Sequence, residues 1–267
     1  MQLFQFQNGY RYNSDSLFFY NFLRSQISPN FHKNALDVGS GCGILALLFA
    51  RDFPKANVFG VEILEKNCLL CRKNAALNKL NAAFINADFT TLNSKNFAEF
   101  VKTEFDFDKQ NETAKTPANE ANFKFDAIFS NPPFYASLGT SSQNAHLDLA
   151  RDERHLPMAE FFLNARKLLT PNGKFYFCYD TQRLNEIFFN LNLANLNVTK
   201  IQFLHTRKEK KAKIAFFETQ PFSKKPCVVL PNAVIYENGE EVSEFAKEVF
   251  VSCGTQSLNF EEVDDEI

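Results

Sequence analysis

Short apolar runs alternate with longer segments of helical periodicity from residue 34 onward. A run over 35–38 leads into three closely spaced glycines, an apolar segment with helical spacing follows, and a second run over 57–61 ends at Glu62. Apolar runs of four or five residues that are bounded by turn residues are typical of buried strands. This part of the sequence therefore predicts a β-α-β unit.

The same alternation continues through most of the chain. Residues 66–81 predict a helix, 82–88 a strand that ends at Asp88, and 124–134 a further buried strand. The pattern is completed by a helix over 158–170 that ends at Thr-Pro-Asn-Gly, a strand over 174–179, and a closing strand pair over 198–206 and 211–220. Strands that alternate with helices imply an α/β, Rossmann-like, doubly wound sheet, mostly parallel with an antiparallel closing strand.

Three segments lie outside the alternation. We expect one main domain over 34–236, preceded by an N-terminal segment over 1–33. Residues 93–123 start with weak helical periodicity and become polar, which predicts a flexible surface insertion. Residues 237–267 are predicted to form an acidic C-terminal tail, to which the sequence assigns no function.

Composition limits the class of protein. With 267 residues and 45% apolar content, the chain can bury a sizeable core. Residues 1–20 lack a basic stretch followed by a continuous apolar one, and the other apolar runs are too short to span a membrane. We therefore expect a cytoplasmic protein with no membrane association and no obligate protein partner. Six scattered cysteines, of which only Cys68 and Cys71 have metal-like spacing, favour free thiols over a metal site.

The three glycines, Gly39, Gly41 and Gly43, predict a sharp turn at which a ligand can approach the backbone closely. A dinucleotide fingerprint would require glycine at the position of Ile44. Asp37, just before the glycines, would also repel a phosphate group at the start of the helix. A cationic ligand without phosphate suits this loop better than NAD does.

The glycine pattern with Asp37, Glu62 and Asp88 resembles that of class I S-adenosylmethionine-dependent methyltransferases. The resemblance implies that 34–236 is the methyltransferase domain and that 1–33 lies over the cofactor, S-adenosylmethionine. It also implies that Glu62 binds both ribose hydroxyls, that Asp88 binds the adenine amino group, and that Asp37 faces the methionine end. The alternative is that each carboxylate is a helix cap or a solvated loop residue.

A second motif, Asn131-Pro132-Pro133-Phe134, forms the carboxyl end of the predicted strand over 124–134. The Asn131 side-chain oxygen and the Pro132 carbonyl can accept the two hydrogens of an exocyclic amine, whose lone pair is otherwise delocalised into the base. Pro132 and Pro133 fix φ and remove amide donors. Phe134, with help from Tyr135, offers a ring on which an unpaired base can stack. A proline-rich turn after a strand is the structural alternative.

This motif resembles that of amino-methyltransferases that act on adenine N6, guanine N2 or a protein glutamine amide. The segments "FQNGYRYNSDSLFF", "LHTRKEKKAKIAFFE" and "PNAVIYENGEEVSEF" resemble a bacterial family that contains the tRNA adenine-N6 methyltransferase acting at position 37 of a valine tRNA. The insertion over 93–123 and the sequence "RDERH" depart from that family. The resemblance implies an RNA substrate, with tRNA as the leading class. Methylation of guanine N2 in rRNA, methylation of a protein glutamine, and a non-catalytic RNA-binding module remain alternatives.

Charge is unevenly distributed, although the net charge is only −2. Residues 200–225 contain eight Lys or Arg and two acids, whereas 237–266 contain ten acids and one Lys. Five of the basic residues lie in the predicted turn between the last two strands and in the first residues after it: Arg207, Lys208, Lys210, Lys211 and Lys213. Their density suits phosphate contacts, and a solvated hairpin is the alternative.

Arg11 and Asp15 precede the first predicted strand of the main domain. Similar residues recur at this place in the resembled family, on the segment that is expected to lie over the cofactor. An amphipathic helix start with Asp15 as its N-cap is the alternative.

Overall fold

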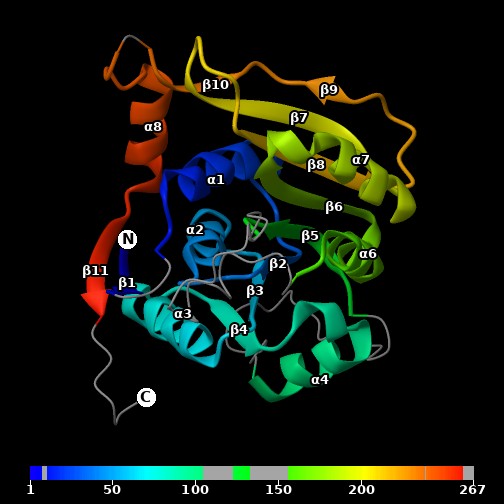
Figure 1. Ribbon diagram of the computed structural model, residues 1–267. Coiled ribbons are helices and arrows are strands. Elements are labelled where there is room, and N and C mark those ends of the chain that lie inside the picture. Colours follow the sequence, from blue (N-terminus) through cyan, green and yellow to red (C-terminus); the bar gives the residue numbers. More distant parts are fainter. Residues whose placement is uncertain (8–10, 105–122, 133–155, 238, 261–267) are drawn as a thin grey trace, which may run out of the picture.

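The computed structural model describes residues 1–7, 11–104, 123–132, 156–237 and 239–260 (Figure 1). Within them, nine strands form one sheet with the order β10-β7-β8-β6-β5-β2-β3-β4, and β9 pairs with β7. The strands are β2 (Asn34–Val38), β3 (Asn57–Glu62), β4 (Ala82–Asn86), β5 (Phe125–Ser130), β6 (Leu169–Asp180), β7 (Leu196–Arg207), β8 (Ile214–Pro221), β9 (Val228–Val229) and β10 (Ala233–Tyr236).

Strands β2 to β6 are parallel, and β8 is antiparallel to both of its neighbours, β6 and β7. The predicted mostly parallel sheet with an antiparallel closing strand is confirmed. The pairing of Asp180 with Ile214 shows that β8 starts where β6 ends. The turn between β7 and β8 therefore lies at the carboxyl edge of the parallel strands, where open α/β sheets bind ligands.

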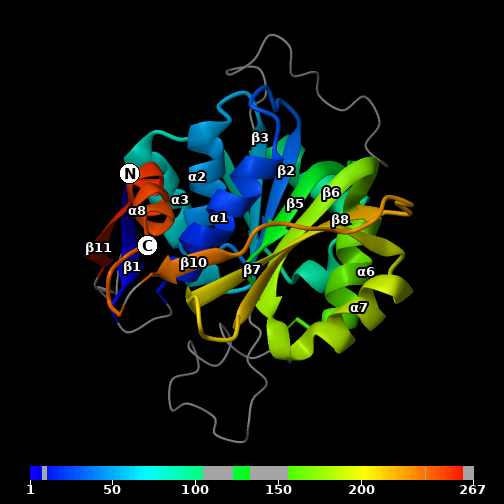
Figure 2. The ribbon, with the colours of Figure 1, turned by 90° about the horizontal axis from the view of Figure 1, so that it is seen from above.

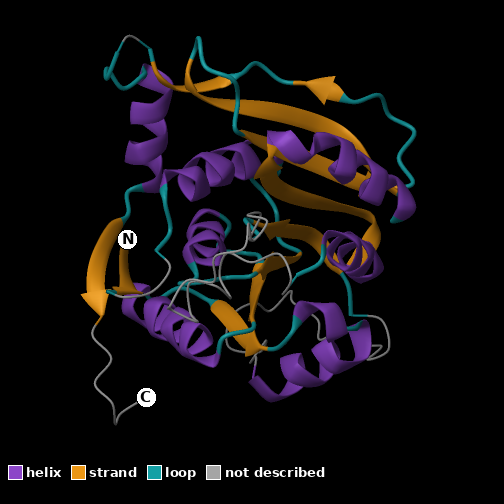
Figure 3. Cartoon of the chain, in the orientation of Figure 1, coloured by secondary structure: helices purple, strands orange, loops and turns teal. Residues whose placement is uncertain are grey.

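Helices cover both faces of the sheet (Figures 2 and 3). They are α1 (Ser14–Gln26), α2 (Ile44–Asp52), α3 (Glu65–Asn78), α4 (Ser94–Glu104), α6 (Met158–Leu168), α7 (Leu184–Leu193) and α8 (Glu244–Cys253). Side chains of α1, α2, α3 and α8 pack in one apolar cluster, and those of α4, α6 and α7 in another. Neighbours in β5 alternate between the clusters, Ala127 and Phe129 in the first and Ile128 in the second. Because both faces are covered, Ala127, Ile128 and Phe129 form a continuous apolar run in the middle of this strand.

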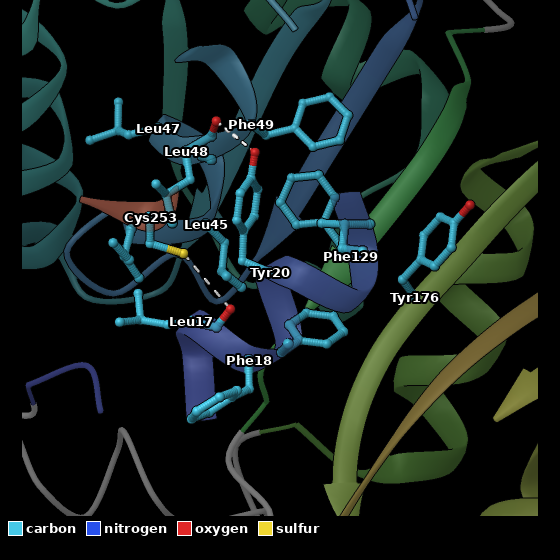
Figure 4. Close-up of a cluster of buried hydrophobic side chains, with 14 of the residues drawn as sticks. Leu17, Phe18, Tyr20, Leu45, Leu47, Leu48, Phe49, Phe129, Tyr176 and Cys253 are labelled. Carbon is cyan, nitrogen blue, oxygen red and sulfur yellow. Dashed lines mark hydrogen bonds between the residues drawn. The ribbon is translucent and has the colours of Figure 1, made fainter. Parts of the chain in front are cut away.

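Helix α1 is fixed against α2 and the sheet (Figure 4). The Tyr20 hydroxyl donates to the Leu48 carbonyl at 2.8 Å and lies 2.8 Å from Asp52 Oδ2. In the same cluster, the ring of Phe49 in α2 stacks on that of Phe129 in β5, with centroids 5.1 Å apart. The start of α1 is capped by Asn13, whose side chain accepts from the Asp15 N–H. The alternative that Asp15 is the N-cap is therefore wrong.

The two ends of the described chain fold together. Strand β1 (Gln2–Phe6) pairs in parallel with β11 (Gln256–Phe260), and α8 packs against α1. Arg51 of α2 donates to the carbonyls of Ser252 and Cys253 at the end of α8, where free carbonyl groups attract a cation. Much of the predicted acidic tail is thus a helix and a strand that close the domain.

The predicted insertion over 93–123 is wrong in its first third. Ser94–Glu104 forms α4, in which Phe97 and Val101 are buried one helical turn apart. The Phe97 ring contacts the rings of Phe59, Phe123 and Phe125, so α4 is part of the core. Residues 105–122 lie outside the described part of the chain. The polar second half of the segment concealed the amphipathic first turns.

The helix predicted over 158–170 ends at Leu168, and the Thr-Pro-Asn-Gly sequence lies inside β6 instead of before it. Leu169 pairs with Phe125, and the pairing resumes only at Lys174 with Ala127. The four residues are therefore a local irregularity in the strand, which the turn-forming sequence made look like a boundary. Among the helices described, no segment is long and apolar enough to cross a membrane.

Candidate active site

The glycine loop joins β2 to α2 and has left-handed backbone conformations at all three glycines. The φ angles are 72° at Gly39, 58° at Gly41 and 86° at Gly43, a region that other residues adopt only with strain. A Cβ built on Gly39 or Gly41 would meet no atom within 4 Å, whereas on Gly43 it would contact Leu47 and Cys71. Gly43 therefore serves packing, and Gly39 and Gly41 border open space that a ligand can enter.

Gly60 in β3 is a further glycine that the loop requires. A Cβ there would lie 2.5 Å from the Ser40 hydroxyl oxygen and 2.4 Å from the Phe84 ring. Its absence lets the loop lie on β3, where the N–H groups of Gly39 and Ser40 both donate to the Val61 carbonyl at 2.9 and 3.1 Å. Gly60 was not predicted to matter, although an isolated glycine inside a strand indicates a close approach of another part of the backbone.

Asp37 lies beneath the loop and is fully buried. Its Oδ2 accepts from the Ala46 N–H in the first turn of α2 at 3.2 Å, and its Oδ1 has no hydrogen-bond partner. Burial raises the pKa of this carboxyl to about 7, with a smaller contribution from the nearby Glu62. A buried carboxylate with one free oxygen is a site that a positively charged ligand would stabilise.

Glu62, at the end of β3, connects the strand to the glycine loop. Its Oε2 accepts from the Gly41 N–H at 2.7 Å and its Oε1 from the Leu64 N–H at 3.0 Å. Burial raises its pKa, although these hydrogen bonds favour the ionised form. Hydrogen bonds from the Ile63 N–H and the Asn67 side chain also favour the ionised carboxylate. Binding of ribose hydroxyls by Glu62 stays a prediction.

Asp88 lies beside Glu62 but not at the end of a strand. Strand β4 ends at Asn86, whose side chain donates to the Glu62 carbonyl at 2.9 Å. Asp88 instead caps the short helix η1 (Phe89–Thr91), where its Oδ1 accepts from the Thr90 N–H and hydroxyl at 2.8 Å each. The predicted strand end was wrong by two residues because a capping aspartate resembles a strand terminus in the sequence. Its proposed adenine contact stays a prediction.

Asn131 directly follows β5, which pairs with β2 so that Phe129 lies opposite Asp37. The Ser130 hydroxyl donates to the Val38 carbonyl at 2.7 Å, so the motif and the glycine loop share one edge. Asn131 Nδ2 donates to Ser16 Oγ at 3.0 Å, and the Cys178 thiol donates to Asn131 Oδ1 at 2.8 Å. Ser16 and Cys178 were not singled out in the sequence, which carries no signal for contacts across 115 and 47 residues.

Pro132 is buried beside Asn131. Pro133, Phe134 and Tyr135 lie outside the described residues. The catalytic roles predicted for Pro133 and Phe134, and the base contact predicted for Tyr135, therefore stay predictions.

The predicted basic turn lies at the same edge of the sheet. The Thr181 N–H, just after β6, donates to the Lys213 carbonyl at 2.8 Å, and the Thr181 hydroxyl donates to the Ala212 carbonyl. Lys208, Lys210, Lys211 and Lys213 are exposed there. Arg207 is partly buried and donates to the Gly239 carbonyl at 2.8 Å. The four lysines therefore present positive charge beside the site, and Arg207 has a structural contact as well.

The remaining polar residues and thiols are placed as follows. Arg11 donates to the side chain of Asn259 in β11 at 3.0 Å. Cys68 and Cys71 are both buried in α3, and the Cys71 thiol donates to the Gly41 carbonyl at 3.2 Å. Over the described ranges, no group of three or more His, Cys, Asp or Glu residues is arranged to hold a metal ion.

Sequence comparison identifies the family. Residues 30–220, well over half of the chain, match the family described as "Methyltransferase domain". The chain belongs to this methyltransferase family. Among solved structures it is similar to a predicted O-methyltransferase from Agrobacterium tumefaciens, with a TM-score of 0.62, 16% identity, and coverage of 92% of this chain and 99% of that one. The protein has the class I S-adenosylmethionine-dependent methyltransferase fold.

Curated relatives are more similar in sequence, but over a smaller part of the chain. The methyltransferase is 26% identical over 189 residues to the tRNA1(Val) (adenine(37)-N6)-methyltransferase of Porphyromonas gingivalis, a match that covers 71% of this chain and 66% of that protein. It is 29% identical over 163 residues to the release factor glutamine methyltransferase of Flavobacterium psychrophilum, covering 57% of this chain and 47% of that one. The chain thus spans just under two thirds of the first relative and about half of the second.

S-adenosylmethionine is the cofactor of this fold, and the residues of the methyltransferase fit it. It carries a positive sulfonium and ammonium group and no phosphate, which suits the unpartnered Oδ1 of buried Asp37. The open space at Gly39 and Gly41 leaves room for it beside Glu62. The residues predicted to hold the cofactor are Asp37, Gly39, Gly41, Gly43, Glu62, Asp88 and Asn131. Among the three glycines of the loop, Gly43 differs because a Cβ built on it would contact side chains of the protein, whereas one built on Gly39 or Gly41 would meet open space.

Proposed function

We propose that the protein transfers the methyl group of S-adenosylmethionine to the exocyclic N6 amine of adenine in RNA, with tRNA as the substrate class. The observation that supports this most is the place of Asn131. Its carboxamide stands at the carboxyl end of β5, next to the strand that carries Asp37 and the glycine loop. An acceptor amine bound by Asn131 would therefore lie beside the methyl donor.

The chemistry needs hydrogen-bond acceptors more than it needs a base. When bound, S-adenosylmethionine supplies an electrophilic methyl group on sulfur. Asn131 Oδ1 and the Pro132 carbonyl accept the two N–H bonds of the amine, which favours the pyramidal nitrogen that attacks the methyl carbon. The N–C bond would form as the S–C bond of the cofactor breaks, and the nitrogen, cationic at that point, would release a proton to solvent.

The lysine-rich turn supports a nucleic acid as the molecule that carries the amine. Lys208, Lys210, Lys211 and Lys213 are exposed at the edge that holds Asn131, and clustered lysines bind phosphates. Several curated relatives are named as tRNA1(Val) (adenine(37)-N6)-methyltransferases. Position 37 of a valine tRNA is accordingly the specific target that we propose, with the reaction in the cytoplasm.

Methylation of a protein glutamine is the second candidate, because two relatives are named as release factor glutamine methyltransferases. A glutamine side chain presents the same pair of amide hydrogens to Asn131 and Pro132, so the site chemistry does not separate the two. The lysine-rich turn favours RNA. The N2 atom of guanine in rRNA is also an exocyclic amine with two hydrogens. The labelling experiment below distinguishes methylation of guanine from methylation of adenine.

The test is an incubation of the protein with methyl-labelled S-adenosylmethionine and, separately, total tRNA from a strain lacking this gene, ribosomal RNA, and a peptide release factor. We expect label in N6-methyladenosine of the tRNA. Label in guanosine alone, or in the release factor alone, would contradict the adenine assignment. The Asn131→Ala variant is the control for the site: it should keep most of the cofactor affinity, because Asp37, the glycine loop and Glu62 are intact, and it should not transfer the methyl group.

A further inference from the structure

The Asn131 carboxamide has a hydrogen-bond partner on each side, and the partners come from two different elements. Ser16 lies in the first turn of α1 and is 3% exposed, and Cys178 lies in β6 and is fully buried. Ser16 Oγ accepts from Asn131 Nδ2 at 3.0 Å, and the Cys178 thiol donates to Asn131 Oδ1 at 2.8 Å. The side chain at the reacting centre is therefore held by groups in the core.

We propose that Ser16 and Cys178 are positioning residues that hold the Asn131 carboxamide with its oxygen toward the acceptor amine. This inference rests on the proposed function, because it assigns a task to the partners of Asn131 in that reaction. Both residues would act through Asn131 and not on the reacting atoms.

Cys178 determines which end of the carboxamide faces the amine. A thiol is a weak donor and a weak acceptor, and burial raises its pKa well above the usual value, so it stays protonated. A carbonyl oxygen has two lone pairs, so Oδ1 can accept from the thiol and still accept from the substrate amine. A flipped carboxamide would place Nδ2 against sulfur and turn a donor toward an amine that already carries two hydrogens.

Ser16 holds the other end of the carboxamide and is itself fixed. The start of this helix is capped by Asn13, whose side chain accepts a hydrogen bond from the Asp15 N–H. One turn after Ser16, the Tyr20 hydroxyl donates a hydrogen bond to the Leu48 carbonyl in α2. The Ser16 hydroxyl is thus carried by a helix that is anchored to α2. Without it, Nδ2 would lose its acceptor in a largely buried place, and the carboxamide could rotate.

The test measures kcat and KM with total tRNA from a strain lacking this gene, and the Kd of S-adenosylmethionine by calorimetry. We expect Ser16→Ala and Cys178→Ala each to lower kcat by roughly 3- to 20-fold, the effect of one hydrogen bond. The KM for tRNA and the cofactor Kd should stay within about twofold, because phosphate contacts dominate RNA affinity. Cys178→Ser should restore most of the activity, because its hydroxyl also donates to Oδ1.

Two matched controls separate positioning from general damage. Ser14→Ala removes an exposed hydroxyl from the same helical turn, and Cys253→Ala removes a buried thiol on α8 that contacts Leu17 instead of Asn131. Both should keep the wild-type kcat. Ser16→Ala is compatible with folding because alanine favours a helix.

Three results would overturn the inference. The first is a wild-type kcat in both Ser16→Ala and Cys178→Ala, and the second is a loss of cofactor affinity in these variants as large as their loss of kcat. The third is a kcat of Cys178→Ser as low as that of Cys178→Ala. Each is distinct from failure of the proposed function. If Asn131→Ala transfers methyl groups at the wild-type rate, the proposed function itself fails. If Asn131→Ala is inactive and the Ser16 and Cys178 variants match the wild type, only the positioning role fails.

Discussion

The Gly41 N–H donates a 2.7 Å hydrogen bond to Glu62 Oε2, so the glycine loop after β2 and the acid at the end of β3 form one unit. The other Glu62 oxygen accepts from Leu64 at the start of α3. The residue predicted to bind ribose therefore also shapes the loop beside it. A change at Glu62 acts on the cofactor both directly and through the loop.

We expect Glu62→Ala to weaken S-adenosylmethionine binding by roughly 10- to 100-fold, because it removes a charged acceptor from Gly41 and from the ligand. Calorimetry with the purified protein measures the Kd. The matched control is Glu65→Ala, which removes an exposed acid three residues away. An unchanged Kd in Glu62→Ala would contradict the role of Glu62.

Cofactor affinity should depend on pH through Asp37. The pKa of this carboxyl is raised from 3.8 to about 7 by burial, so below that pH the proton must leave before a cation can bind. We predict that the affinity of S-adenosylmethionine rises roughly tenfold between pH 6 and pH 8. The Asp37→Asn variant should bind S-adenosylmethionine weakly, and its affinity should not rise between pH 6 and pH 8. Any pH dependence that remains in this variant comes from titration of the cofactor itself. The same slope in both proteins would show that Asp37 does not face the positive charge.

The same carboxyl should also shape stability. Because the pKa is higher in the folded state than in the unfolded state, ionisation costs folding free energy as the pH rises from about 4 to about 7. We expect Asp37→Asn without cofactor to melt above the wild type at pH 8, with the difference shrinking toward pH 4. Thermal unfolding followed by circular dichroism measures this, and a difference independent of pH would contradict the raised pKa.

Positive charge at the β7–β8 turn should act on RNA and not on the cofactor. We expect Lys210→Ala with Lys211→Ala to raise the KM for tRNA and to reduce the slope of log affinity against log salt by about 1 to 2. The matched control is Lys224→Ala with Lys225→Ala, because these exposed lysines follow the opposite end of β8. Equal effects in the two double variants would indicate a general charge effect and not an RNA contact at this turn.

The sequence predicted the central sheet well because its strands are short apolar runs with both faces buried. The glycine loop, Glu62 and Asn131 are found at the predicted strand ends, since the carboxyl edge of a parallel sheet follows from the order of its elements. The family match and the fold confirm that the chain is a class I methyltransferase, and the roles of the individual motif residues stay predictions.

The parts that the sequence did not predict depend on contacts between distant residues. Pairing of β1 with β11 needs both ends of the described chain, and the alternation in each strand is too short to indicate a partner. Likewise, Ser16 and Cys178 are ordinary residues until the fold brings them to Asn131. The helical periodicity at the start of 93–123 was recognised, but α4 was wrongly assigned to a surface insertion because Phe97 and Val101 were judged together with the polar residues that follow.

Methylation of adenine N6 in tRNA, with Asn131 as the residue that binds the acceptor amine, is best tested by mass spectrometry of tRNA nucleosides. The tRNA comes from a strain lacking this gene and complemented with either the wild type or Asn131→Ala. We predict that N6-methyladenosine is absent from the deletion strain, is restored by the wild type, and is not restored by Asn131→Ala. Unchanged N6-methyladenosine in the deletion strain, or full restoration by Asn131→Ala, would contradict the account.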